Sequence, residues 1–416
     1  MKQIAVQTVS LGDRYMPYIL VFIAGVSNVS IAMTSIGIGI GVLVMLIDCI
    51  RRREFPQIDR WLGFVILLYI STSFFIAAMS NEPEISLKEA GSEAMRIFPF
   101  IFAVGYLHSR RMIAAVVGAF SLSVFLNDVI ASIQFLLQEN CGWGVGRPIG
   151  TVKSPTFLGS FMLMALPVLM LVPRALPISC LGKKILWSVG IFSIFVLIIS
   201  ATRGAWLSSV VTLILGGVLT RSYLLAYRKQ IICGIVVAVI LLFSVHPLQS
   251  RLTSILDKNY PSNVERILMW EAAIAIWRDH PVFGIGQSEF GLIYNRDYIS
   301  PLAKERPVDA EHPRTGHGHP HNNFLKVLSE RGLFGMFFFL LLHGCFLFRF
   351  LCFWKAKKGK AESIFALCGI MVLIGFHLEG MTDTNIALTH IMRTYWLLLG
   401  VCLSGTMIRE KRYELE

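Results

Sequence analysis

A short histidine-rich segment holds the densest group of side chains that could take part in chemistry. Residues 316–323 read Gly-His-Gly-His-Pro-His-Asn-Asn, with histidines at alternate positions: His317, His319 and His321. Imidazole is the side chain best suited to accept a proton near neutral pH. With the upstream Asp309 and Glu311 it could also bind a divalent metal, but the spacing matches no established zinc pattern. We therefore expect a general base and no metal site, and for His317 alone a hydrated loop position without a specific role.

Basic side chains beside apolar segments are candidates for binding an anion. Arg203 opens an apolar run, and Arg266 lies in a segment, 263–279, with helical spacing. An arginine at the edge of a membrane span, with no carboxylate nearby in sequence, is costly and usually marks a functional pairing. Because guanidinium binds phosphate oxygens through two parallel hydrogen bonds, we expect Arg203 and Arg266 to bind phosphate. The alternative for these two arginines is that they extend to the lipid head groups. Arg147 and Lys153, in a shorter outer loop, are candidates to complete the pocket.

The composition places these residues in a membrane protein. Of 416 residues, 55% are hydrophobic and 15% charged, and the mean hydropathy is +0.65. A spanning helix needs roughly 20 mostly apolar residues. Such runs lie near 17–35, 36–50, 61–79, 95–108, 112–137, 156–172, 185–200, 204–220, 230–246, 323–350, 361–380 and 389–408. The sequence therefore predicts an all-α polytopic membrane protein with about twelve transmembrane helices, the first of which is retained because no cleavage site follows it.

The distribution of basic residues predicts the topology. Lys and Arg gather at every second connection between the runs, at 51–60, 110–111, 174–184, 221–229, 349–360 and 409–412. The positive-inside rule makes these connections cytoplasmic, so the net charge of +12 indicates topology and nucleic-acid binding is not expected. With an even number of spans, both termini are cytoplasmic. We expect three regions: residues 1–246 with nine spans, one large outer loop at 247–322, and residues 323–416 with three spans.

The histidine segment also carries a motif. From His321 the chain reads His-Asn, nine residues, Gly332, two residues and Gly335. This resembles the pattern of the O-antigen ligases, which join O-polysaccharide to lipid A core, and of the wider superfamily with O-antigen polymerases and protein O-oligosaccharyltransferases. Residues 202–206 look like the family's arginine motif, and Arg266, Trp270 and residues 280–286 look like the start of its large periplasmic loop. The resemblance runs from about residue 145 to 400; the N-terminal third matches only in hydropathy.

The resemblance implies a fold, a reaction and a site. The fold is that of a C-type glycosyltransferase, with short helices in the large periplasmic loop. The reaction is metal-independent and inverting, uses no cofactor, and moves O-antigen from undecaprenyl diphosphate to lipid A core on the periplasmic face of a Gram-negative inner membrane. The catalytic base is His321, on motif position. The remaining site residues are diphosphate-binding Arg203, Arg266, Arg147 and Lys153, and supporting His319, Asn322 and Trp270.

Several alternatives remain open from sequence. A polymerase or a protein O-oligosaccharyltransferase of the same superfamily would share the donor chemistry. A transporter of the lipid-linked glycan fits the topology, although no internal repeat is found and the polar residues concentrate on one face. Glu379, Asp383 and Arg393 are interpreted as ion-pairing or capping groups in preference to catalytic ones. Asp128 is either a buried hydrogen-bonding group or part of a polar path to the site, and the sequence does not decide between the two.

Overall fold

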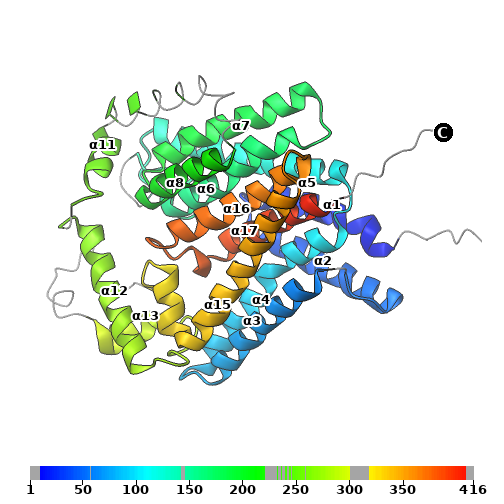
Figure 1. The fold of residues 1–416 in the computed structure, drawn as a ribbon. Coiled ribbons are helices and arrows are strands. Elements are labelled where there is room, and N and C mark those ends of the chain that lie inside the picture. The colour runs from blue at the N-terminus through cyan, green and yellow to red at the C-terminus, as the bar shows by residue number, and fades with distance from the viewer. Residues whose placement is uncertain are drawn as a thin grey trace, which may run out of the picture.

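The protein is a bundle of helices, shown as a ribbon in Figure 1. The computed structural model describes residues 10–56, 58–141, 146–220, 246–257, 259–299 and 318–408, with separate positions between 232 and 244. These residues contain no β-strand. The long helices are α1 (Leu11–Val26), α2 (Ile31–Arg52), α3 (Arg60–Ala78), α4 (Pro83–Tyr106), α5 (Arg110–Leu136), α6 (Pro155–Leu171), α7 (Cys180–Ile199), α8 (Arg203–Leu219), α15 (Asn323–Ala356), α16 (Ala361–Glu379) and α17 (Thr389–Met407).

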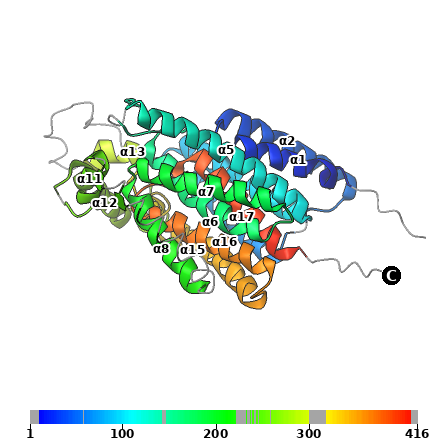
Figure 2. The same cartoon turned by 90° about the horizontal axis from the view of Figure 1, so that it is seen from above.

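The elements between α8 and α15 that have described bounds gather at one end of the bundle. They are α11 (His246–Thr253), α12 (Pro261–Asp279), α13 (Phe290–Ile293) and the π-helix η2 (Tyr294–Tyr298). Figures 1 and 2 both place α11 and α12 at the end opposite the C-terminus. The predicted helix 263–279 is thus confirmed as part of α12. Its buried side chains, among them Met269, Ala273 and Ile276, pack with Phe290 and Tyr294 into a small core of their own.

Helices α6 and α16 form the centre of the bundle. In the apolar stretch of α6, 78% of residues are buried, and in α16 67%, against 33% in α2 and 28% in α15. The helix α17 packs on α4 and α16, and α3 packs on α15. A helix that is apolar all round, as α6 is, must be surrounded by other helices or lipid, whereas α2 lies at the edge with much of its surface exposed.

Among the described residues, seven helices are long and apolar enough to cross a bilayer: α2, α3, α5, α6 with its 3₁₀ extension, α7, α15 and α16. The chain is therefore a polytopic α-helical membrane protein. The predicted count of twelve spans is not confirmed, and the predicted span 230–246 lies mostly outside the described residues. The shorter α8 is apolar too.

Two predicted boundaries are wrong. The first two spans do not divide at 35 and 36; α1 ends at Val26, and α2 begins after Ser30, whose side chain accepts a hydrogen bond from the Met33 backbone amide. The apolar run predicted at 95–108 lies within α4, which already begins at Pro83. Its early turns carry charged residues, so apolar runs do not reveal them.

Those charges are paired inside the protein. Arg331 of α15 donates to Glu93 of α4 at 2.9 Å and to the hydroxyls of Tyr69 and Ser73 of α3. The hydroxyls of Tyr69 and Ser73 also donate to Glu93, at 2.5 and 2.6 Å. Because both charged groups and their remaining hydrogen-bonding atoms are satisfied, the buried pair fixes how α3, α4 and α15 meet.

The segment that follows α12 forms backbone hydrogen bonds with a break in α15. Gly332 has φ 61° and ψ −165°, which interrupts the helix. The freed carbonyls of Ser329 and Glu330 accept from the amides of Ile285 and Gly286 at 3.1 and 2.9 Å. The amides of Leu333 and Phe334 donate to the carbonyls of Pro281 and Val282 at 2.9 and 3.0 Å. The second half of the sequence motif thus fastens the outer segment to the helix that begins beside His321.

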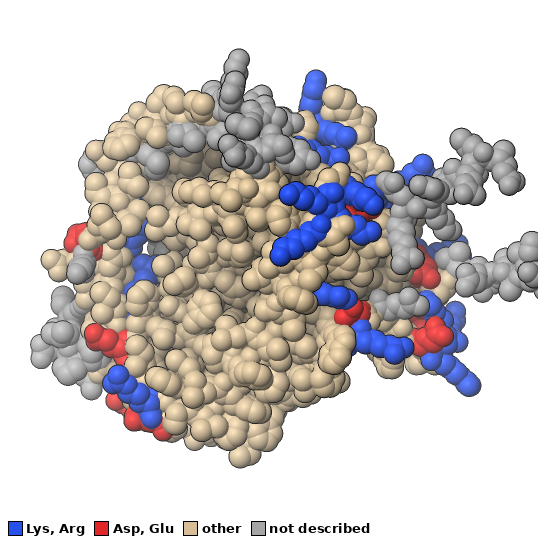
Figure 3. Space-filling view, in the orientation of Figure 1, with Lys and Arg blue, Asp and Glu red and all other residues tan. Residues whose placement is uncertain are grey.

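The charged side chains lie at the two ends of the molecule, and the surface between them is apolar. In Figure 3 the middle of the molecule is almost free of Lys, Arg, Asp and Glu, and Lys and Arg gather on the side that bears the C-terminus. The opposite end carries fewer charges, of both signs. A broad belt without charge is the surface that a bilayer requires.

The break predicts a sharp effect of Gly332→Ala. Only glycine adopts this backbone conformation readily, and an added Cβ would lie 2.2 Å from the Val282 carbonyl oxygen. We expect a loss of about 1–3 kcal/mol of stability, measured by thermal unfolding of the purified protein in detergent. The control is Gly344→Ala in the same helix, where an added Cβ meets nothing within 4 Å. Equal unfolding temperatures for both variants would contradict the assigned role of the break.

Candidate active site

His321 lies where the outer segment enters α15. It has φ 49°, a left-handed conformation uncommon for a residue with a side chain, and the next residue, Asn322, caps α15 by accepting from the amides of Phe324 and Leu325. Asn322 also donates from its own amide to the Thr384 hydroxyl and from its side chain to the Met381 carbonyl. These bonds hold the strained residue against the turn between α16 and α17.

Asp383, in that turn, orients the imidazole. Its Oδ1 lies 3.1 Å from His321 Nδ1 and accepts from the Thr384 amide at 2.8 Å. The His321 hydrogen bond, the His321 charge and the Arg266 guanidinium hold the pKa of Asp383 well below its usual range, against the effect of burial. The ionised carboxylate favours the tautomer with hydrogen on Nδ1, in which Nε2 is the basic ring nitrogen. The sequence predicted only His321; its partner lies 62 positions away and had been left undecided.

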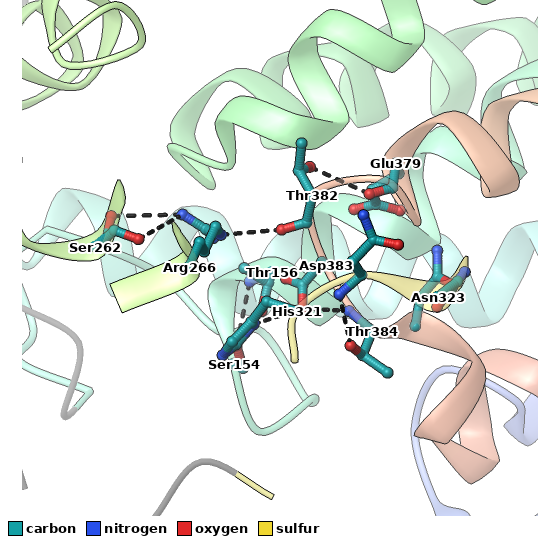
Figure 4. A network of polar contacts seen from close by, with 12 residues as sticks. Ser154, Thr156, Ser262, Arg266, His321, Asn323, Glu379, Thr382, Asp383 and Thr384 are labelled. Carbon is teal, nitrogen blue, oxygen red and sulfur yellow. Dashed lines mark hydrogen bonds and ion pairs between the residues drawn. The ribbon is translucent and has the colours of Figure 1, made fainter. Parts of the chain in front are cut away.

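Arg266 approaches the same turn from α12. Its Nε donates to the Thr382 carbonyl at 3.0 Å and its Nη1 to the Ser262 carbonyl at 3.3 Å (Figure 4). Its Nη2 makes no hydrogen bond to another described residue. Arg266 therefore stands beside the His321–Asp383 pair with donors left for an anion.

Arg203, the first residue of α8, is held more completely. Its Nη1 donates to the carbonyl and hydroxyl of Ser254 at 2.8 and 3.0 Å. Its Nη2 donates to the Ser262 hydroxyl and the Asn263 amide oxygen at 2.8 and 2.7 Å. Within the described part of the chain neither Arg203 nor Arg266 pairs with a carboxylate, so their charges are not neutralised by the protein there. Arg203 binds the α11–α12 connection to α8, and any ligand must compete with these neutral oxygens.

Two further arginines lie within electrostatic range of this pair. Burial, Arg251 and the other two arginines lower the pKa of Arg147 to about 9. Arg203 and Arg251 both stack on the ring of Tyr260, at 5.1 and 5.6 Å from its centre. We call these four residues, Arg147, Arg203, Arg251 and Arg266, the arginine cluster. Arg251 was not predicted, because an arginine in a polar outer segment carries no distinguishing sequence signal.

Arg147 is placed by polar side chains of α5. The Gln134 side chain accepts from the amides of Ile149 and Gly150 at 3.0 and 2.8 Å, and Asn127 accepts from the Thr151 amide at 2.8 Å. Gly150 has φ 62°, and an added Cβ would lie 2.2 Å from the Asn127 oxygen. These contacts fix the short segment that also carries Lys153.

The remaining predicted residues have different positions. Lys153 is exposed and lies within electrostatic range of His390, at the start of α17. Of the four basic residues predicted to bind the diphosphate, Lys153 is therefore the one that does not belong to the arginine cluster. The ring of His319 lies 4.6 Å from that of His321, and Trp270 is half-buried on α12. His317, Asp309 and Glu311 lie outside the described residues.

The structure places two buried carboxyl groups, Glu379 and Asp128, whose roles the sequence did not assign. Glu379, one turn before Asp383, accepts from the Ser160 hydroxyl at 2.8 Å, and its other oxygen has no hydrogen-bond partner (Figure 4). Asp128 of α5 accepts from the Ser193 hydroxyl of α7 at 2.6 Å. Glu379 adjoins the site, whereas the bond of Asp128 joins two helices.

The contacts of Arg203 predict that Arg203→Lys destabilises the outer end. Lysine keeps the charge but cannot form the four hydrogen bonds of the guanidinium group. We therefore expect the free energy of unfolding to fall by about 2 kcal/mol, measured by thermal unfolding. The matched control is Arg278→Lys, at an exposed position of α12. If both variants unfold at the wild-type temperature, Arg203 does not hold α8 to the α11–α12 connection.

Comparison with known proteins agrees with this geometry. No curated protein matches the chain. A family model described as O-Antigen ligase matches residues 188–340, a region that starts in α7, contains three members of the arginine cluster, and ends in α15 after His321 and both motif glycines. By this match residues 188–340 are similar to the O-antigen ligase family.

Proposed function

We propose that the protein is an O-antigen ligase, a glycosyltransferase that moves O-antigen polysaccharide from undecaprenyl diphosphate to a sugar of lipid A core. The observation that carries the proposal is the His321–Asp383 pair beside Arg266, which belongs to a cluster of four arginines. A base oriented by a carboxylate, next to positive charge, suits attack by a hydroxyl on a sugar whose leaving group is a diphosphate.

The reaction follows from these positions. An acceptor hydroxyl attacks the anomeric carbon from the face opposite the diphosphate, and His321 Nε2 takes its proton. The bond between the anomeric carbon and the diphosphate oxygen breaks, and that oxygen keeps the electron pair. The guanidinium groups offset the charge that develops on the leaving diphosphate, while Asp383 stabilises the imidazolium. A single displacement inverts the configuration at the anomeric carbon.

The arginine cluster takes the role that a divalent ion has in many enzymes acting on diphosphates. Its members carry permanent charge on rigid donors that match phosphate oxygens. We therefore expect transfer without added metal and with no other cofactor.

The proposed orientation places the site on the periplasmic face of the inner membrane. Lys and Arg collect at the end opposite α11 and α12, and the positive-inside rule assigns that end to the cytoplasm. Both termini are then cytoplasmic, the short helices lie outside, and the donor arrives within the outer leaflet.

An O-antigen polymerase is the second candidate, because it uses the same donor with a lipid-linked glycan as acceptor. The family match covers both activities. Deleting the gene separates them: loss of a ligase leaves bare lipopolysaccharide core, whereas loss of a polymerase leaves core with a single repeat unit.

The proposal predicts transfer by the purified protein and its loss in His321→Ala. The assay mixes undecaprenyl-diphosphate-linked O-antigen with rough lipopolysaccharide, with a chelator present, and follows the product on gels. We expect His321→Ala to be slower by about a hundredfold or more, because the hydroxyl loses its base. An exposed histidine, changed in His280→Ala, is the control. Normal transfer by His321→Ala would disprove the assigned base, and a requirement for metal would disprove the role given to the arginines.

A second prediction concerns Asp383→Asn. The amide retains the size of the side chain but no longer stabilises the imidazolium or selects its tautomer, so kcat should fall by about a hundredfold or more with little change in the donor KM. Asp279→Asn makes the same change at an exposed carboxylate of α12 and should keep its activity. If Asp383→Asn retained kcat while His321→Ala lost it, the base would act without the carboxylate.

A further inference from the structure

Three basic side chains outside the arginine cluster meet at the outer ends of α2, α6 and α17: Lys153, His390 and Arg393. His390 and Arg393 are three residues apart on the first turns of α17 and so share a face. The Lys153 and Arg393 charges both act on His390. We call these three residues the outer basic site.

Arg393 is held by neutral oxygens only. Its Nη1 donates to the Ser35 hydroxyl at 2.8 Å and to the Ile31 carbonyl at 3.3 Å, both on the first turns of α2. Its Nε is buried without a hydrogen-bond partner. The guanidinium of Arg96 acts on it as a like charge, and Arg96 itself pairs with Glu89 at 2.9 Å. The charge of Arg393 thus has no carboxylate partner among the described residues.

His390 presents an unused polar atom. The residue is 8% exposed, and its buried Nε2 has no hydrogen-bond partner in the part of the chain that the structure describes. Its ring lies 5.4 Å from Phe157 and 5.5 Å from Phe161, both of α6. A buried polar atom without a partner costs about 1–3 kcal/mol, so its retention beside two cations indicates a ligand that accepts hydrogen bonds.

The outer basic site is open toward the bilayer. The turns of α2 that hold Arg393 have exposed apolar side chains: Ile31 is 40% exposed, Met33 43% and Ile36 58%. The segment bearing Lys153 reaches the same region, because the Thr151 hydroxyl donates to the Asn28 carbonyl between α1 and α2. A lipid moving in the outer leaflet therefore reaches these cations from the side.

This site adjoins the base but is separate from the arginine cluster. Ser154, next to Lys153, and Thr156 are drawn in the same network of polar contacts as His321 in Figure 4, and they lie at the start of α6. The arginine cluster approaches His321 through α12 and Thr382 instead. A transfer between two lipids requires two such approaches to one base.

We propose that the outer basic site binds a phosphate group of the acceptor glycolipid, so that Lys153, His390 and Arg393 recognise a phosphorylated acceptor while the arginine cluster holds the donor diphosphate. The inference rests on the proposed function. It assigns Lys153, expected from sequence to bind the donor, to the acceptor.

The test compares acceptor with and without phosphate. Binding of purified protein to rough lipopolysaccharide, native or treated with phosphatase, is measured by microscale thermophoresis for wild type, Lys153→Gln and Arg393→Gln. We expect each variant to bind native acceptor about tenfold more weakly, with no further loss for dephosphorylated acceptor. Binding of undecaprenyl diphosphate should not change. The controls Lys88→Gln and Arg278→Gln remove one charge at exposed outer positions, and the exposed Lys153 gives a variant whose folding is not at risk.

Several outcomes overturn the inference. They are unchanged binding in both variants, an equal loss of donor binding, or equal competition by phosphatidylglycerol vesicles, which would make the site a general phospholipid contact. Kinetics separate this inference from the proposed reaction. Transfer with an unchanged acceptor KM in both variants rejects the site and keeps the reaction, whereas phosphate-dependent binding without any transfer keeps the site and rejects the reaction.

Discussion

The site depends on four backbone hydrogen bonds that join residues 281–286 to the break in α15. A membrane helix cannot leave carbonyl and amide groups unpaired in the bilayer, so a break at Gly332 is stable only if another segment supplies the missing partners. The segment that does so directly follows α12. This pairing sets where α12 lies along the bundle, and with it where Arg266 stands relative to His321 at the start of the same broken helix.

The arginines of the protein divide into two kinds by their partners. Arg331 and Arg96 are buried against Glu93 and Glu89, and their charges are neutralised within the bundle. Arg203, Arg266 and Arg393 bond instead to hydroxyl and carbonyl oxygens, which orient a guanidinium without neutralising it. An oriented but uncompensated charge at the membrane surface stabilises an anion more than it stabilises the fold. This difference separates the arginines proposed to bind phosphate from those whose charge is neutralised inside the bundle, although Arg203 also joins α8 to the α11–α12 region.

Features with a local signal could be predicted from the sequence, whereas features that depend on a distant partner could not. Hydropathy predicted the membrane class, and a motif spanning few residues predicted the similarity to the O-antigen ligase family and proposed His321 as the base. Asp383 could not be assigned, because an aspartate in a short turn has many explanations until His321 is seen 3.1 Å away. The start of α4 was missed because Glu89, Glu93 and Arg96 make it polar, and their partners on other helices are invisible along the chain. Lys153 was grouped by sequence proximity with Arg147, and their separation depends on how the segment 146–154 turns over α5.

In the proposed reaction, the position of His321 allows both substrates to be lipids. His321 and Asp383 are fixed by the caps and turns of α15, α16 and α17, so neither has to move to meet a substrate. The arginine cluster lies toward α8, α11 and α12, and the outer basic site toward α2 and α6. Two lipid carriers in one leaflet cannot reach the same site from the same side, because their chains occupy the same depth of the bilayer. Separate phosphate anchors on either side of a rigid base allow each head group to reach the reaction centre while its chains remain in the bilayer.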